Sequence, residues 1–187
     1  MIAAALAKFG RIDILVNGAG IDILVPTIET TVEQWDRVHS INLKGPFLCG
    51  QAAAKVMMKQ GGGKIINIAS AGGHCGIPDK AAYCASKAGI LGLTRVMAID
   101  WAKYNITVNS ISPGRTGTPI MMQMKQQQPA EVFERRTRRI PLNRIAEVQD
   151  IANLAVFLAS KESDYITGQD IIIDGGLLAT HPGHVQG

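Results

Sequence analysis

Tyr83 and Lys87 lie four residues apart in the segment AAYCASKAGILGLTR. On a helix, residues at this spacing share a face, so the phenol and the ammonium can approach each other. A phenol titrates near pH 10, and an ammonium about 4–5 Å away favours the phenolate by roughly 3–4 kcal/mol at an effective dielectric constant near 20. The pair therefore predicts a tyrosine with a lowered pKa that acts as a general acid or base near neutral pH.

Two polar residues precede this pair, Ser70 by thirteen positions from the tyrosine and Asn42 by forty-one. Ser70 directly follows an expected strand, at the end where open α/β sheets bind ligands. A hydroxyl in this place can donate to a substrate oxygen as negative charge develops. Simpler interpretations stay open, because Ser70 could cap a loop and Asn42 could satisfy backbone near a bend at Gly45-Pro46.

The elements that must position these residues follow from short apolar runs that alternate with longer helical patterns. The runs are apolar on both faces, which is typical of parallel strands covered by helices on both sides. A capping-box pattern at Thr31 and Gln34 opens the longest helix, and glycines at 61–63 end it. We expect strands over 12–17, 64–69, 107–111 and 170–174, and helices over 2–9, 31–59, 80–103, 119–126, 130–138 and 147–159. The fold class is α/β with a parallel sheet.

The composition predicts one folded domain over residues 1–187, with 180–187 as a tail. Of the 187 residues, 47% are hydrophobic and 18% are charged, which argues against disorder. No apolar run reaches the roughly eighteen residues of a membrane helix, and no nucleic-acid motif is present. We therefore expect neither a membrane nor a nucleic acid as partner. The start MIAAALAKFG is too short for a secretory signal, which makes the cytoplasm the default location.

Charge is concentrated in ERRTRR at 134–139, followed by Arg144. This segment is either a solvated helix face or a surface that attracts an anionic substrate, such as a sugar acid or a carrier-protein phosphate. His181 and His184 lie three apart near the end of the chain, without the further ligands that a metal site would need. We predict no metal.

Segments along nearly the whole chain, from about residue 8 to residue 178, resemble the short-chain dehydrogenase/reductase family. They are DILVNGAG (13–20), INLKG (41–45), KIINIASAGG (64–73), YCASK (83–87), ITVNSISPGRTGTP (106–119) and YITGQDIIIDGG (165–176). The resemblance implies a Rossmann-like parallel sheet with helices on both faces. It also implies hydride transfer between NAD or NADP and a carbonyl or secondary alcohol, with 3-oxoacyl-carrier-protein reductases and sugar-acid dehydrogenases as the most similar branches.

By this resemblance the catalytic residues are Asn42, Ser70, Tyr83 and Lys87. Tyr83 transfers the proton, Lys87 also binds the nicotinamide ribose, and Asn42 holds a water that joins Lys87 to solvent. The residues implied to contact the cofactor are Asn17, Ala19, Gly20, Tyr83, Lys87, Pro113, Gly114, Thr116 and Thr118.

Some positions depart from the family pattern. Gly18 stands where the N-N-A-G motif has its second asparagine, and Arg115 and Gly117 replace more apolar residues. Residues 115–140 match the family's variable substrate lid, and we call them the lid segment. This segment does not name a substrate.

The family's glycine-rich turn, T-G-x-x-x-G-I-G, has no match in this chain. The sequence resembles an amino-truncated member that supplies strands 4–7 of the usual seven and leaves ILV at 14–16 as an exposed apolar edge. The choice between NAD and NADP stays open, as does whether Met1 is the true start. The resemblance also implies a homo-oligomer, a tetramer or a dimer. The alternative function is an inactive remnant that serves as an oligomerisation or interaction subunit.

Overall fold

The computed structural model describes residues 1–126 and 128–180, apart from the side chains of residues 120 and 124. Within these residues, four strands form one sheet in which every neighbouring pair is parallel, in the order β1-β2-β3-β4. The strands are β1 (Ile14–Asn17), β2 (Gly63–Ile68), β3 (Ile106–Pro113) and β4 (Asp170–Ile173). The predicted class, α/β with a parallel sheet, is confirmed.

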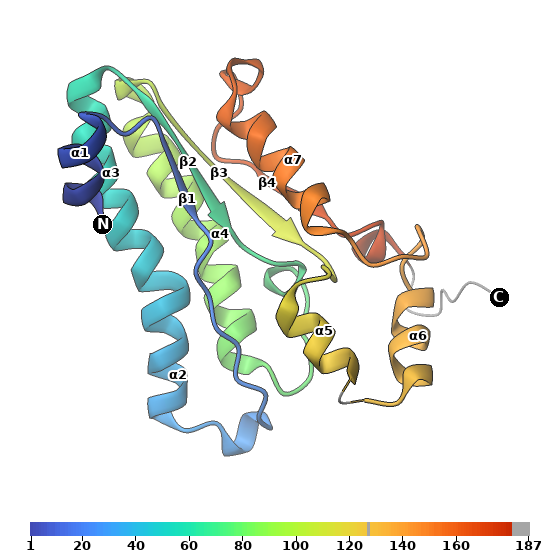
Figure 1. Cartoon of the computed structure of the whole chain (residues 1–187). Helices are drawn as coiled ribbons and strands as arrows, with labels where there is room; N and C mark the ends of the chain where they lie inside the picture. The colour runs from blue at the N-terminus through green and yellow to red at the C-terminus, as the bar shows by residue number, and fades with distance from the viewer. Residues whose placement is uncertain (127, 181–187) are drawn as a thin grey trace.

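Helices cover both faces of the sheet (Figure 1). On one face lie α3 (Gly45–Gln60) and α4 (Ala81–Trp101), and on the other lies α7 (Val148–Ala159). A short pair, α5 (Pro119–Gln126) and α6 (Ala130–Arg138), follows the end of β3. The remaining helices are α1 (Ile2–Phe9), which packs near α3, and α2 (Val32–His39). All six helical segments expected from the sequence are present.

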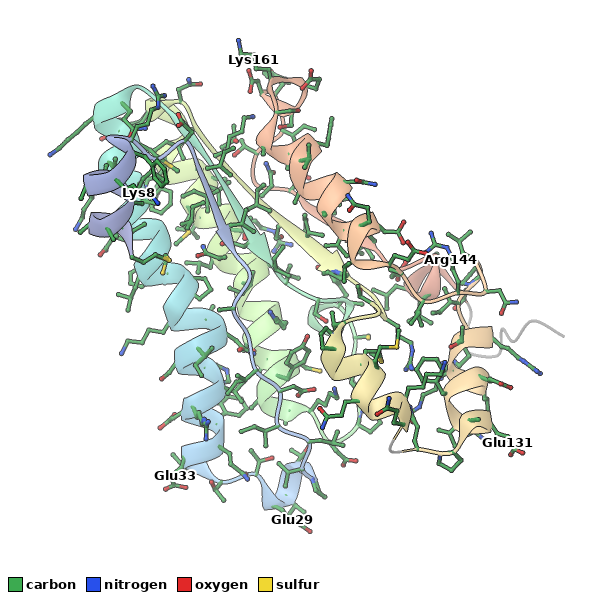
Figure 2. All side chains as sticks on the ribbon, in the orientation of Figure 1. Lys8, Glu29, Glu33, Glu131, Arg144 and Lys161 are labelled. Carbon is green, nitrogen blue, oxygen red and sulfur yellow. The ribbon has the colours of Figure 1, made fainter. Side chains whose placement is uncertain are left out.

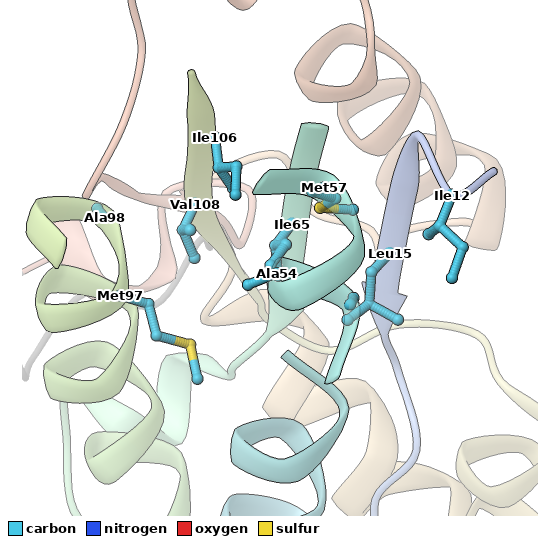
Figure 3. Packing of buried hydrophobic residues seen from close by; sticks show 10 residues of the cluster. Ile12, Leu15, Ala54, Met57, Ile65, Met97, Ala98, Ile106 and Val108 are labelled. Atoms are coloured by element: carbon cyan, nitrogen blue, oxygen red, sulfur yellow. The ribbon is translucent and has the colours of Figure 1, made fainter. Parts of the chain in front are cut away.

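The strands contribute apolar side chains to both faces, because successive residues of a strand point to opposite sides. Ile65 packs in the cluster beneath α3 and α4, whereas Ile66 packs in the cluster beneath α7. Figure 3 shows the first cluster, which joins three strands to two helices through Leu15, Ala54, Met57, Ile65, Met97, Ala98, Ile106 and Val108. The sheet and α4 therefore form one packed platform.

The helix expected over 31–59 is interrupted by a π turn, Ser40–Lys44, between α2 and α3. Pro46 has no N–H and so cannot make the helical bond to the carbonyl of Asn42. The chain accommodates this with a wider turn, in which the Gly45 N–H donates to the Ser40 carbonyl. Such π turns occur frequently at functional sites. Asn42 lies in the middle of this one and is buried.

Both predicted ends of the long helix are confirmed. The Gln34 N–H donates to the Thr31 hydroxyl at 3.2 Å, and the Gln34 side chain accepts from the Thr31 N–H at 3.0 Å, which completes the capping box. Gly61 ends α3 with φ 87°, a left-handed conformation that favours glycine.

β1 forms one edge of the sheet, and the exposure expected for residues 14–16 is present at two of the three apolar positions. Ile14 is 45% exposed and Val16 is 50% exposed, whereas Leu15 between them is 7% exposed because it faces α3. Within the described ranges, no helix is both long and apolar enough to cross a membrane. His181 and His184 lie outside the described residues.

Candidate active site

Ser70 lies just past the carboxyl end of β2, at the start of a 3-10 turn, η3 (Ala71–Gly73). Its hydroxyl accepts a hydrogen bond from the Gly72 N–H at 3.0 Å, and the residue is 9% exposed. The turn packs directly on α4, since a Cβ on Gly73 would lie 3.0 Å from the carbonyl of Lys87. Backbone contact between η3 and α4 thus places the serine beside the helix that carries Tyr83.

Tyr83 lies in the first turn of α4 and is partly buried, and its ring and the Ser70 hydroxyl both lie 3.4 Å from the place that a Cβ on Gly72 would take. Lys87, one turn further on, is 5% exposed. The Lys87 Nζ donates to the Ile68 carbonyl at 2.8 Å and lies 5.8 Å from the centre of the Tyr83 ring. The predicted approach of the phenol, the ammonium and Ser70 is therefore present.

The predicted direction of the Tyr83 pKa is wrong for this structure. Burial raises the pKa of Tyr83 above its ordinary value, the interaction with Ser70 opposes this rise, and electrostatic interactions with Asp22 and Cys84 add to it. Lys87 does not reverse this balance because its ammonium lies by the ring and donates to the Ile68 carbonyl. Burial also lowers the pKa of Lys87 to about 8. Because its pKa is raised, Tyr83 is a protonated phenol at neutral pH.

A second cation near Tyr83 was not anticipated from the sequence. Lys80 precedes α4, and its Nζ lies 5.5 Å from the Tyr83 ring centre. It forms an ion pair with Asp22, in the loop after β1, and both side chains are partly buried. The Val25 N–H also donates to the Asp79 carbonyl at 2.9 Å, so two distant loops meet beside the phenol. Only the tertiary fold reveals this pair, since 58 positions separate its members.

Asn42 holds the loop after β1 in place. Its side-chain oxygen accepts from the Ile21 N–H and its nitrogen donates to the Ile21 carbonyl, both at 2.8 Å. The same nitrogen donates to the Ser86 hydroxyl of α4 at 3.2 Å. A Cβ on Gly20 would lie 3.4 Å from the Asn42 oxygen and 3.5 Å from the Lys87 Nζ. Gly20 therefore lies between Asn42 and Lys87, and all three lie within one cluster.

Asn17, at the carboxyl end of β1, uses its side chain inside the protein. It donates to the Asn67 side chain at 2.8 Å, which in turn donates to the Thr94 hydroxyl of α4 at 2.9 Å. All three residues are buried, so this ladder fixes β1, β2 and α4 together. Gly18 has space beside it, since a Cβ there would meet only Ile68 at 3.8 Å. Packing therefore does not require glycine at the position where the family has asparagine.

The loop after β3 is shaped by its neighbours in the fold. A Cβ on Gly114 would lie 2.7 Å from the Asp174 Cβ, so glycine is needed here for packing against the chain after β4. The Thr116 hydroxyl donates to the Gly114 carbonyl at 3.4 Å. The Thr118 hydroxyl accepts from the Met121 N–H at 3.3 Å and caps α5. The family resemblance implies that Gly114 contacts the cofactor, but packing against Asp174 already requires glycine here.

The loop after η3 also carries His74, which is exposed. Its Nε2 lies 2.7 Å from an Asp170 carboxylate oxygen, and this carboxylate also accepts from Ser110 and Ser112 at 2.6 and 2.9 Å. The histidine thus ties the loop after Ser70 to β3 and β4. The spacing in the sequence gave no signal for this pairing, because 96 positions separate the two residues.

A cleft of about 630 Å³ lies away from the Tyr83 cluster, between α4 and the segment formed by α2 and the π turn. Its lining does not include the four predicted catalytic residues. Among the described residues, no group of three or more histidine, cysteine, aspartate or glutamate side chains could hold a metal ion. The cluster around Tyr83 is therefore the strongest candidate for chemistry.

The chain matches a family model described as enoyl-(acyl carrier protein) reductase over residues 1–178. Among curated proteins, 2-dehydro-3-deoxy-D-gluconate 5-dehydrogenase of Escherichia coli is 44% identical over 182 residues, which cover 96% of this chain and 70% of that protein. A 3-oxoacyl-[acyl-carrier-protein] reductase of Thermotoga maritima is 42% identical over 178 residues, 95% of this chain and 71% of the relative.

Solved structures of proteins that are also named as oxidoreductases have a fold similar to that of this chain. The gluconate 5-dehydrogenase from Burkholderia cenocepacia, in complex with NADP and tartrate, is 36% identical with a TM-score of 0.90, over 96% of this chain and 70% of that chain. Levodione reductase is 38% identical with a TM-score of 0.91, over 96% of this chain and 72% of that chain. Fold, sequence and the named activities of the relatives lead to one conclusion: this chain belongs to the short-chain dehydrogenase/reductase family of oxidoreductases.

Proposed function

We propose that this chain transfers hydride between a nicotinamide cofactor, NAD or NADP, and a carbonyl or secondary alcohol, with Tyr83 as the general acid and base. The observation that carries the proposal is the grouping of Tyr83 and Ser70 around Gly72, beside the buried ammonium of Lys87, at the carboxyl end of a parallel sheet. Ligands of open α/β sheets bind at this end. The chain spans 70% of the sugar-acid dehydrogenase it matches, so the activity of this polypeptide is itself part of the proposal.

In the direction of reduction, Tyr83 donates its proton to the substrate oxygen. The raised pKa of Tyr83 suits this role, because the phenol stays protonated at neutral pH and gives up its proton only when negative charge develops beside it. Ser70 donates a second hydrogen bond to the same oxygen. Oxidation of an alcohol follows the reverse path, and there the positive charge of Lys87 favours the phenolate.

Lys87 fits a role in holding the cofactor. An ammonium has three N–H groups, and the structure commits one of them to the Ile68 carbonyl. The remaining two can donate to the ribose hydroxyls. The bound dinucleotide supplies or accepts the hydride. Thr116 and Thr118, in the loop after β3, would contact the nicotinamide amide and the phosphates, and Ala19 and Gly20 would approach the adenosine side through their backbone.

Asn42 would carry the proton path from Lys87 to solvent through a water. Its side chain is already used by Ile21 and Ser86. The water would therefore bind the Asn42 carbonyl, which Pro46 leaves without its usual helical donor. A buried carbonyl that lacks its ordinary partner is a reasonable place for an ordered water.

The experiment is a steady-state assay of the 187-residue chain, with each cofactor in turn, following the nicotinamide absorbance. D-gluconate serves as an alcohol and acetoacetyl thioester as a carbonyl, because the relatives are named for these two classes of compound. We expect turnover with one class and one preferred cofactor. Ser70→Ala is the matched variant, and its turnover should fall without loss of cofactor affinity. Absence of both turnover and cofactor binding would contradict the proposal.

A second candidate is a non-catalytic subunit that associates with other chains, and the exposed edge of β1 favours it. Ile14 and Val16 are about half exposed on a strand with one unpaired side, which is a surface prone to pairing. Light scattering after size exclusion tests this idea. Replacing Val16 with lysine should dissociate such an assembly, whereas lysine at the exposed Val148 of α7 should leave it intact.

A further inference from the structure

The lid segment contains a group of cations that has no acidic partner among the described residues. Arg115 follows Gly114 at the end of β3, and its guanidinium centre lies 5.1 Å from the ring centre of Phe133 in α6. Lys125 of α5 places its Nζ 5.1 Å from the same ring. Arg136, one turn after Phe133 in α6, adds a third charge. Burial lowers the pKa of Arg115, and the positive charge of Arg136 lowers it further. Two of the three cations lie against one buried aromatic side chain, and the third interacts electrostatically with Arg115.

Arg115 is also poorly satisfied. Its Nε is buried and has no hydrogen-bond partner, and its Nη2 lies 3.7 Å from the Met121 sulfur. A thioether is a weak acceptor, so this contact does not replace the water that the guanidinium loses. By contrast, Arg11, Lys64, Lys80 and Arg144 each pair with an aspartate. A buried donor without a partner destabilises the folded protein, and a fitting acceptor would remove this cost.

The position of Arg115 links it to the reaction centre. Ile68 pairs with Ile111 in the sheet, so two residues further along each strand Ser70 is level with Pro113. Arg115 therefore leaves the sheet at the same edge, next to the strand that delivers Ser70. The Ala146 N–H donates to the Arg115 carbonyl at 2.8 Å, which holds the backbone of Arg115 in place below α5 and α6.

We propose that Arg115, supported by Lys125 and Arg136, binds an oxyanion, either a carboxylate or a phosphate, beneath the lid helices. The anion exchanges the weak contact with Met121 for charge-assisted bonds, which a guanidinium forms two at a time. Under the proposed function, the anion is a carboxylate on the substrate, remote from the reacting carbon. The other group that would supply such an oxyanion to Arg115 is a phosphate of the dinucleotide. Figure 2 shows the side chains that fill the space between α5 and α6.

The test follows the arginine Nε–Hε signals of the ¹⁵N-labelled full chain by NMR, with the Arg115 signal assigned by its loss in Arg115→Lys. Separate titrations use D-gluconate, inorganic phosphate, NADP and uncharged sorbitol, which matches gluconate in size. We expect saturable movement of the Arg115 signal with gluconate and none with sorbitol. A response to NADP and phosphate but not gluconate would assign the anion to the cofactor. No saturable response to any of the anions would overturn the proposal.

Matched variants distinguish a defined anion site at Arg115 from nonspecific electrostatic attraction to the positive charges of the lid segment. Arg115→Gln should weaken gluconate binding by about tenfold or more, since a charge-assisted bond contributes roughly 1.5–3 kcal/mol. Arg138→Gln removes the same charge from the exposed last turn of α6 and should change the affinity less than about twofold. Equal losses in both variants would contradict a defined site. Because binding is measured without turnover, a failure of the proposed catalytic function leaves a different pattern: no reaction, but intact binding of gluconate.

Discussion

The two regions that meet at the carboxyl edge of the sheet are built differently. Around Tyr83, buried polar groups are nearly all paired: Asn42 with Ile21 and Ser86, Lys87 with the Ile68 carbonyl, and Ser70 with Gly72. In the lid segment, the short helices α5 and α6 surround an arginine whose Nε has no partner. The buried polar groups around Tyr83 have hydrogen-bond partners without a ligand, whereas the arginine Nε in the lid segment has none.

This difference separates two tasks. A fully paired buried network holds its side chains in one geometry, which is what proton transfer needs. An unsatisfied cation beneath short helices gains a partner when an anion arrives, which is what selection of a substrate needs. Substitutions around Tyr83 should therefore change turnover or stability, whereas substitutions in the lid segment should mainly change affinity.

The largest expected effect is that of Tyr83→Phe, which removes the proton donor and keeps the ring. Turnover should fall by about 10²-fold or more, because general acid catalysis typically contributes 10²–10⁴. Cofactor affinity should stay nearly constant, since Lys87 remains. Steady-state kinetics and cofactor titration check both expectations. Unchanged turnover would remove the phenol from the mechanism.

The next effect concerns Lys87, whose folded-state pKa of about 8 lies below the ordinary 10.5. Between these values the unfolded chain binds the proton more tightly, so stability should rise as pH increases through this window. The gain approaches about 3 kcal/mol, and Lys87→Met should abolish it. Urea unfolding at several pH values measures the effect, with the exposed Lys59→Met as control. Parallel pH profiles of wild type and Lys87→Met would contradict the depressed pKa.

Two glycines of the loop that carries Ser70 provide a matched pair. A Cβ on Gly73 would press on the backbone of α4 at 3.0 Å, whereas a Cβ on Gly76 would meet nothing within 4 Å. Gly73→Ala should destabilise the fold by about 1–3 kcal/mol and reduce turnover, because η3 must move away from Tyr83. Gly76→Ala should be nearly neutral. Thermal unfolding and kinetics compare them, and equal behaviour would show that η3 does not depend on this contact.

The smallest effect is expected in the lid segment. Thr118→Ala removes the cap of α5 and should lower stability by about 1 kcal/mol. Because α5 belongs to the lid segment, hydrogen exchange should increase in α5 while the protection of β2 and α4 stays unchanged. Loss of protection throughout the sheet would mean that the lid segment and the Tyr83 cluster are one cooperative unit, which would remove the contrast between them.

Much of the fold could be predicted because its signals are local. The helix over 130–138 and the capping box at Thr31 depend on residues within one or two turns. The spacing of Tyr83 and Lys87 placed both on one face of α4, as expected. The pKa of Tyr83 could not be predicted in this way, because it depends on burial and on Asp22, which comes from a distant loop.

The sequence by itself determined the parallel α/β class, the helix boundaries near Thr31 and Gly61, and the grouping of Tyr83 with Lys87. These follow from periodicity, capping and glycine conformation, all of which act over short stretches of chain. Only the tertiary structure decided which polar and charged side chains face each other: Lys80 with Asp22, His74 with Asp170, and Arg115 with no acidic partner among the described residues. Electrostatic partners depend on distance in space, and distance along the chain does not report it.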